Sequence, residues 1–238
     1  MNTKVTPHLQ TSLHEWSPKL WPEVEQLSGQ YGRLERLDSK SHAEQLYEAF
    51  RLDRENQNWT YLPYGPFDQL QAFKNWLDEK AAAQDPMFFS IIDQSTGRAS
   101  GLAALMRITP EQGVIEVGNI HFSPLLQRTR LATEAMFLMM QYVFEQLGYR
   151  RYEWKCNDQN ERSKAAALRL GFQYEGTFRQ HMVVKGKNRD TAWFSILDSE
   201  WPKLKESFQA FLAAENFDSA GQQVRSLTQL RELHHGHF

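Results

Sequence analysis

The segment between residues 114 and 156 constrains the fold most, because it predicts two strands joined by a helix. Val114–Phe122 is rich in apolar and β-branched residues, which is typical of a strand. Residues 128–147 carry apolar side chains at helical spacing, and Gly148 is well placed to end that helix. In residues 151–156, aromatic residues and a cysteine alternate with charged residues, which indicates a half-buried strand. This order predicts a parallel strand pair with a right-handed crossover.

The rest of the chain predicts further strands and helices around this unit. In chain order we expect a strand at 33–37, helices at 41–50 and 67–83, strands at 88–93 and 100–107, a helix at 160–170, strands at 172–179 and 191–197, and a helix from Trp201. Ser41 is a candidate cap for the first of these helices. The predicted class is an α/β fold with a mixed, mostly antiparallel twisted sheet and one central parallel strand pair.

We expect three segments along the chain: an N-terminal arm at 1–28, one α/β domain at 29–198, and a C-terminal helical extension and tail at 199–238. With 238 residues, of which 41% are hydrophobic, the chain can bury one sizeable core. Trp16 and Trp21 are expected to pack the arm over the domain.

The composition narrows the compartment and the partners. A formal charge of −2 gives no signature of a polyanion-binding protein, so we expect no nucleic-acid partner. The N-terminus lacks the apolar run of a signal peptide, and no window reaches membrane-spanning length, so we expect no membrane partner. Cys156 is the single cysteine, which favours a reducing compartment, and the expected location is cytoplasmic. A homodimer is left open.

The turn after the Val114–Phe122 strand is a candidate anion site. A strand that turns into a helix presents unpaired backbone N–H groups and the positive end of the helix dipole, where a phosphate can bind. The residues that line this turn are Gln127, Arg128, Thr129, Arg130, Leu131 and Ala132. Their two arginines add positive charge that can pair with phosphate oxygens.

The turn and the elements around it resemble the acyl-CoA-binding half of the GNAT N-acetyltransferase family. That family carries a Gln/Arg-x-x-Gly-x-Gly/Ala turn, and here Arg130 stands in place of the first glycine while Ala132 keeps the second small position. The loop must therefore adopt an ordinary α conformation at Arg130 or contact phosphate through the guanidinium. Asn160-x-x-Ser163 followed by Leu170-Gly-Phe172 is similar to the branch of ribosomal-protein alanine and serine N-terminal acetyltransferases.

The resemblance, which covers roughly residues 30–198, implies the GNAT fold, with the parallel strand pair splayed around the acyl-CoA site. It further implies transfer of an acetyl group from acetyl-CoA to a primary amine by direct attack in a ternary complex. The turn would then hold the CoA pyrophosphate. The backbone at Ile120, His121 and Phe122 would align the pantetheine arm. Asn160 is a further residue on the cofactor side, although its position also suits a helix N-cap.

The resemblance also implies a proton donor for the departing thiolate. Many GNATs carry a tyrosine four residues before the glycine of the Leu170-Gly-Phe172 motif, but here that place is held by Ala167. Ser163 is at the position where the resembling branch has a serine near the thiol, so it is the implied donor. The alternative is that Ser163 is only a polar residue in the first turn of a helix.

Two residues of the Val114–Phe122 strand are candidates for accepting the amine proton. Glu116 is a carboxylate on an otherwise apolar strand, which is costly to bury without a role, and several GNATs carry a base at this place. His121 is the rival, because a histidine titrates near neutral pH. Strand alternation puts the two side chains on opposite faces unless a bulge intervenes.

The expected acceptor is a peptide α-amine or a small amine, bordered by the loop that carries Trp59, Tyr61 and Tyr64. An α-amine has a reference pKa of about 8, against about 10.4 for lysine, so more of it is neutral at pH 7. Trp59 could instead pack inward. A small-molecule acceptor such as a polyamine, amino acid or drug, and a non-catalytic acyl-CoA-binding protein, remain alternatives. His234, His235 and His237 lack a fourth convergent ligand, so no metal is expected.

Overall fold

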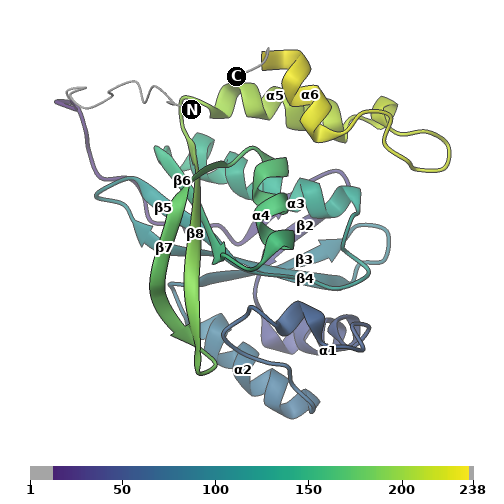
Figure 1. Cartoon of the computed structure of the whole chain (residues 1–238). Helices are drawn as coiled ribbons and strands as arrows, with labels where there is room; N and C mark the ends of the chain where they lie inside the picture. The colour runs from purple at the N-terminus through teal and green to yellow at the C-terminus, as the bar shows by residue number, and fades with distance from the viewer. Residues whose placement is uncertain (1–12, 236–238) are drawn as a thin grey trace.

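The computed structural model describes residues 13–235, and within them eight strands form one sheet in the order β1-β2-β3-β4-β5-β6-β8-β7 (Figure 1). The neighbouring strands β5 and β6 are parallel, and the other neighbours are antiparallel. The predicted α/β class with one central parallel pair is therefore confirmed. The strands are β1 (Gln26–Ser28), β2 (Gly32–Arg36), β3 (Met87–Asp93), β4 (Ala99–Thr109), β5 (Val114–Phe122), β6 (Arg151–Asn157), β7 (Gln173–Val184) and β8 (Lys187–Leu197).

Helices cover both faces of the sheet (Figure 1). On one face lie α1 (Ser39–Phe50) and α2 (Leu70–Ala82). On the other lie α3 (Arg130–Gln141), which continues as a π-helical turn over Tyr142–Gln146, and α4 (Glu161–Leu170). The C-terminal helices α5 (Trp201–Leu212) and α6 (Leu227–His235) stack above α3 and α4 (Figure 1). None of the helices in the described part of the chain has the length and apolar character to cross a membrane.

The segments outside the central sheet are attached to it in different ways. The first strand, β1, lies within the expected N-terminal arm, and Trp16 anchors this arm by donating from Nε1 to the carbonyl of Glu111 at 2.9 Å. Trp21 is instead exposed. The side chains of the C-terminal histidines and residues 1–12 lie outside the described residues.

The predicted cap of the first helix is wrong. Asp38, not Ser41, is the N-cap of α1, and its carboxylate accepts hydrogen bonds from the backbone N–H groups of Lys40 and Ser41. The cap therefore lies three residues earlier than expected, because the Asp38 carboxylate satisfies the unpaired donors of the first turn.

Strand β5 contains a bulge that decides which side chains share a face. Gly118 pairs with Ala104, but the next pair joins His121 to Leu102, so β5 holds one extra residue there. Asn119, in the bulge, has a φ of 50°. Because Ala104 and Leu102 lie on the same face of β4, the bulge brings His121 onto the same face as Gly118 and Glu116. Simple alternation would have separated Glu116 from His121.

The parallel pair separates partway along its length. Its pairing runs from Val114 opposite Arg151 to Val117 opposite Trp154 and ends there. Beyond this point β5 continues to pair with β4, and β6 with β8. The edge of β5 from Gly118 to Phe122 that faces β6 therefore has no strand partner, and the sheet opens between the two strands. This opening leads towards the N-terminal ends of α3 and α4.

A buried carboxylate joins the N-terminal edge of the sheet to α3. Glu134 accepts hydrogen bonds from the backbone N–H groups of Gln30, Tyr31 and Gly32 at 2.6, 2.8 and 3.0 Å. Burial raises the pKa of Glu134, and these three donors oppose that rise. A Cβ at Gly29 would stand 2.4 Å from the Glu134 carboxyl carbon, so a larger residue there would displace this carboxylate. Sequence periodicity gave no indication of this contact.

Candidate functional site

Glu116 belongs to a line of alternating charges across the sheet. Its carboxylate lies 2.6 Å from the Arg107 guanidinium and 2.9 Å from Lys155 Nζ, and Lys155 also pairs with Glu153 at 2.7 Å. The side chains of Glu116 and Lys155 are only 4% and 5% exposed. Lys155 Nζ further lies 3.8 Å from the centre of the Trp193 ring. Two cations thus compensate the buried carboxylate, as a charge in such a place requires.

His121 lies in an aromatic cage and not beside the charged groups. Its ring stacks on Phe50 with centroids 3.8 Å apart, and Trp59 meets it edge-on at 4.0 Å. Neither ring nitrogen has a hydrogen-bond partner among the described residues. Burial lowers the pKa of His121 to about 3, so the ring is neutral at physiological pH. Both candidate bases are therefore buried, His121 within this aromatic cage and Glu116 between its two cations.

Ser163 lies at the separation point of the parallel pair. Its Oγ accepts a hydrogen bond of 3.0 Å from the Trp154 indole, the residue at which the β5–β6 pairing ends. That bond uses a lone pair of the hydroxyl and leaves its hydrogen available to donate. Ser163 also faces the buried thiol of Cys156: burial raises the pKa of this thiol, and the hydroxyl opposes the rise. The Ser163 hydroxyl thus lies between the Trp154 indole and the Cys156 thiol.

Asn160 has the capping role that its position allowed. It is the N-cap of α4, and its Oδ1 accepts from the Ser163 backbone N–H at 3.1 Å. Ala167, the residue of α4 at the place where many GNATs have a tyrosine, is fully buried. The cap fixes the first turn of α4, and with it the backbone of Ser163.

The candidate phosphate turn has a defined backbone. Arg128 takes a left-handed conformation with φ of 63°, and Thr129 caps α3 by accepting from the Ala132 N–H at 3.1 Å. The N–H groups of Arg130 and Leu131, in the first helical turn, have no acceptor within the described part of the chain. Gln127 braces the turn by donating to the Phe122 carbonyl at 2.9 Å. The turn therefore presents backbone donors at the mouth of the opening between β5 and β6.

The guanidinium of Arg130 packs against two aromatic rings. The group lies 3.6 Å from the centre of the Phe217 ring and 5.5 Å from that of Tyr31. As the first residue of α3 it has ordinary helical backbone, and the left-handed residue of the turn is Arg128 instead. Of the two alternatives for Arg130, an ordinary α conformation is the one that its backbone adopts. Its side chain attaches the C-terminal extension to the start of α3.

The loop between α1 and α2 touches three elements around the opening. Its Asn58 accepts from Gln127 at 3.1 Å, and its Tyr61 hydroxyl donates to the Gln159 carbonyl, before α4, at 3.1 Å. At the tip of the β7–β8 hairpin, Lys185 Nζ donates to the Trp59 carbonyl at 3.0 Å. The loop from Asn58 to Tyr61 thus forms an arch, which connects the candidate phosphate turn, the start of α4 and the β7–β8 hairpin.

The aromatic residues of this loop differ in their exposure. Trp59 is 4% exposed and packs inward, the alternative left open for it. Tyr64 lies against Trp76 with ring centroids 4.4 Å apart, and burial raises the pKa of its hydroxyl. Tyr61 is half-buried at the surface of the arch. Trp59 and Tyr64 therefore anchor the α1–α2 loop in the protein interior. Tyr61 is the aromatic residue of this loop that a ligand could reach.

Sequence reasoning missed the cations that surround Glu116. Arg107 lies on β4 and Lys155 on β6, and the ion pairs depend on the strand registers rather than on a local motif. One indication was available, because Glu153 and Lys155 occupy the charged phase of an otherwise aromatic strand. Charged side chains that the fold buries require partners.

Known proteins with the same fold identify the class. The family described as "Acetyltransferase (GNAT) domain" matches residues 33–173, more than half of the chain. A GCN5-related N-acetyltransferase from Brucella melitensis has 52% sequence identity and a TM-score of 0.91, over 92% of this chain and 100% of that one. The acetyltransferase MccE, in complex with acetyl-CoA and AMP, shares the fold at 19% identity and a TM-score of 0.62, over 71% of this chain and 93% of its own.

A curated relative supports the ribosomal branch. The "Putative ribosomal N-acetyltransferase YdaF" of Bacillus subtilis (strain 168) is 34% identical over 71 residues, which are 30% of this chain and 39% of that protein. The match thus spans well under half the length of this relative. Together, the fold, the separated strand pair and these matches define an N-acetyltransferase. The chain belongs to the GNAT acetyltransferase family.

Proposed function

We propose that this protein transfers an acetyl group from acetyl-CoA to a primary amine by direct attack in a ternary complex. One observation carries the proposal: the two candidate proton-transfer groups flank the point where the parallel pair separates. Glu116 lies one residue before Val117, where the pairing ends, and Ser163 binds the Trp154 indole on the opposite strand. A thioester lying in the opening would have a carboxylate on one side and a hydroxyl on the other.

The donor would enter between the strands. The unpartnered edge at Ile120, His121 and Phe122 offers backbone groups to the pantetheine amides, and the turn from Gln127 to Ala132 offers N–H groups to the pyrophosphate. MccE, which shares this fold, is described in complex with acetyl-CoA. We infer the same donor here.

The chemistry needs two proton transfers. The neutral amine nitrogen attacks the thioester carbonyl and forms the new C–N bond, and collapse of the tetrahedral adduct breaks the C–S bond. Glu116 takes the amine proton through water, because its carboxylate is almost fully buried and its Oε2 is held by both Arg107 and Lys155. Ser163 gives its hydroxyl proton to the departing thiolate and regains one from solvent.

The acceptor would bind beneath the arch of the α1–α2 loop. Tyr61 provides a half-buried ring with a polar tip, while Trp59 and Tyr64 hold the loop in place. We favour a peptide N-terminal α-amine, which agrees with the ribosomal relative, and keep a small-molecule amine as the alternative.

The test is turnover with purified full-length protein, acetyl-CoA and a panel of peptides, polyamines and amino acids, read by mass spectrometry and free thiol release. Acetylation of α-amines or small amines supports the proposal. Acetylation of internal lysines alone would contradict the acceptor class. Stabilisation by acetyl-CoA without thiol release from any amine would favour the acyl-CoA-binding alternative.

A further inference from the structure

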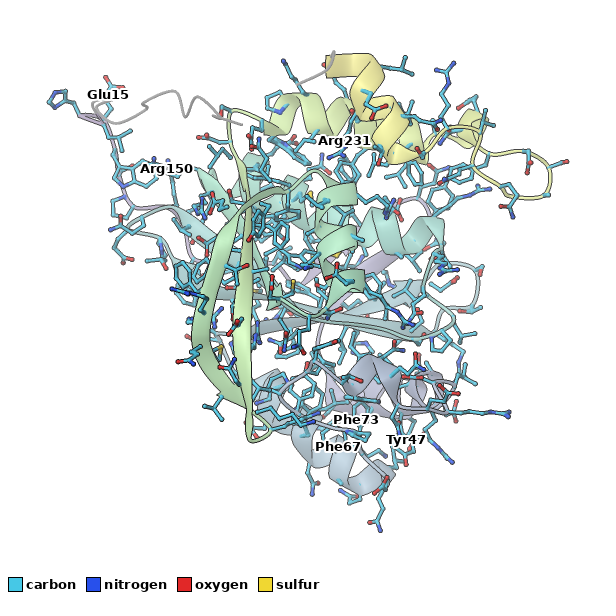
Figure 2. All side chains as sticks on the ribbon, in the orientation of Figure 1. Glu15, Tyr47, Phe67, Phe73, Arg150 and Arg231 are labelled. Atoms are coloured by element: carbon cyan, nitrogen blue, oxygen red, sulfur yellow. The ribbon has the colours of Figure 1, made fainter. Side chains whose placement is uncertain are left out.

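The C-terminal extension brings a second arginine to the end of α4. Arg231 of α6 extends towards α4 (Figure 2), and its Nη1 would lie 3.2 Å from a Cβ placed at Gly171, the C-cap of that helix. Arg169, in the last turn of α4, lies over Phe211 of α5 at 6.0 Å. Three helices thus converge on two guanidinium groups.

Neither of these two arginines forms an ion pair with a carboxylate among residues 13–233, although the charge of Glu232 opposes the lowering of the Arg231 pKa by burial. By contrast, the buried Lys155 and the half-buried Arg151 each pair with two carboxylates. Arg169 and Arg231 form no ion pair, and the buried Nε of Arg231 has no hydrogen-bond partner in the same described range. Arg231 Nη1 lies against Gly171, two residues after Arg169, and burial together with the charge of Arg231 lowers the pKa of Arg169. Two guanidinium groups without ion pairs can together bind an anion.

The position of the pair relates it to the donor site. Arg169 Nη2 donates to Thr133 Oγ1 at 2.9 Å, and Thr133 is the fourth residue of α3. The same helix begins at the turn to which we assign the pyrophosphate. The pair is therefore about one helical turn from that site, on the side towards α4.

We propose that Arg169 and Arg231 bind the 3′-phosphate of the CoA nucleotide. This inference rests on the proposed use of acetyl-CoA. The pyrophosphate already has the backbone donors of the turn, whereas the ribose joined to it carries a second, dianionic phosphate. Two guanidinium groups supply planar N–H pairs that match phosphate oxygens. Arg169 remains accessible at the surface, so a ligand can reach the pair.

The proposal makes the C-terminal extension part of the donor site. Arg231 comes from α6, beyond the residues matched by the family, so donor recognition here would extend past the common domain. Discrimination between CoA and a donor that lacks the 3′-phosphate would then depend on this extension.

The experiment compares the affinities of CoA and 3′-dephospho-CoA for the full-length protein by calorimetry. We expect wild type to prefer CoA by at least about tenfold, and Arg231→Gln and Arg169→Gln to reduce that preference to under about threefold. Arg225→Gln is the matched control, because Arg225 is an exposed arginine of the same extension, and it should keep the wild-type ratio. The ratio is taken within each variant, so a general loss of stability cancels.

Several results would overturn the inference. Equal affinity of wild type for the two ligands would do so, as would an unchanged ratio in Arg231→Gln or Arg169→Gln. If Arg231→Gln does not fold, the wild-type ratio and Arg169→Gln decide. Failure of the proposed function looks different: if acetyl-CoA is not the donor, neither nucleotide binds, and if only the transfer fails, CoA binds while no amine releases thiol.

Discussion

The Lys155 ammonium lies 2.9 Å from the Glu116 carboxylate, and both side chains are almost fully excluded from solvent. Removal of either leaves the other short of a partner in a buried position, which is costly. A loss of activity on changing Glu116 therefore has two candidate causes, loss of the base and disturbance of the ion pairs. The neighbouring Glu153 separates them, because it pairs with the same ammonium at 2.7 Å.

The Glu116→Gln variant should lose catalytic rate and keep donor binding. General-base removal typically costs about 10²–10⁴-fold, and we expect kcat to fall within that range at pH 7. The loss should shrink at high pH, where the amine is already neutral. Glu153→Gln is the control and should keep kcat within about threefold. Equal losses in both variants across the pH range would assign Glu116 to structure alone.

The Ser163→Ala variant should lower kcat by about 10²-fold or more, with little change in the Kd of acetyl-CoA. The reason is that the hydroxyl acts on the leaving thiolate, whereas the cap from Asn160 uses only the Ser163 backbone. Trp154→Phe removes the indole donor but keeps the hydroxyl, so its kcat should fall much less. Turnover at wild-type rate in Ser163→Ala would show that water or another group protonates the thiolate.

The Arg130→Gly variant should weaken the fold more than donor binding. Stacking on Phe217 is lost and glycine is unfavourable in a helix, so we expect unfolding to become easier by about 1–2 kcal/mol. The Kd of acetyl-CoA should stay within about threefold, since the backbone donors of the turn remain. Denaturant unfolding of Phe217→Ala and the double variant measures the coupling. A tenfold or greater loss of affinity would mean that the guanidinium also contacts phosphate.

His121 should make the fold sensitive to acid. Its pKa is lowered to about 3 in the folded protein, so below its ordinary value near 6.5 the unfolded chain binds the proton more readily. Its contribution to stability is therefore complete above pH 6.5 and decreases as the pH falls towards 3, by about 1.4 kcal/mol per pH unit. Urea unfolding at pH 7.5 and 4.5 should show a smaller acid loss in His121→Phe than in wild type. Parallel losses would place the acid sensitivity elsewhere.

Much of the fold could be predicted because the spacing of apolar residues along the sequence indicates each helix and strand locally. The bounds expected for β5 are those observed, and the apolar spacing of residues 128–147 corresponds to α3 and its π-helical turn. The parallel crossover then follows from general rules of connection. The GNAT resemblance rested on the same segment, and the family match covers it.

The features that escaped prediction depend on contacts between distant residues. The bulge at Asn119 is a property of the pairing of β5 with β4, and it alone decides the face of His121. The cations around Glu116 come from two other strands. Helix α6 is only nine residues long, and it is held by contacts with α5 and α4.

The contact of Glu134 with the turn before β2 has a consequence for how the chain reaches its fold. Residues 30–32 leave the ribosome long before Glu134 exists, and the Gly32 bond closes a loop of 102 residues. Such a closure carries an entropic cost that local pairing cannot offset, so it must follow the docking of α3. Strands β1 and β2 would then be among the last parts to order. A nascent chain stopped before α3 would present an uncompleted sheet edge, the kind of surface on which chains aggregate.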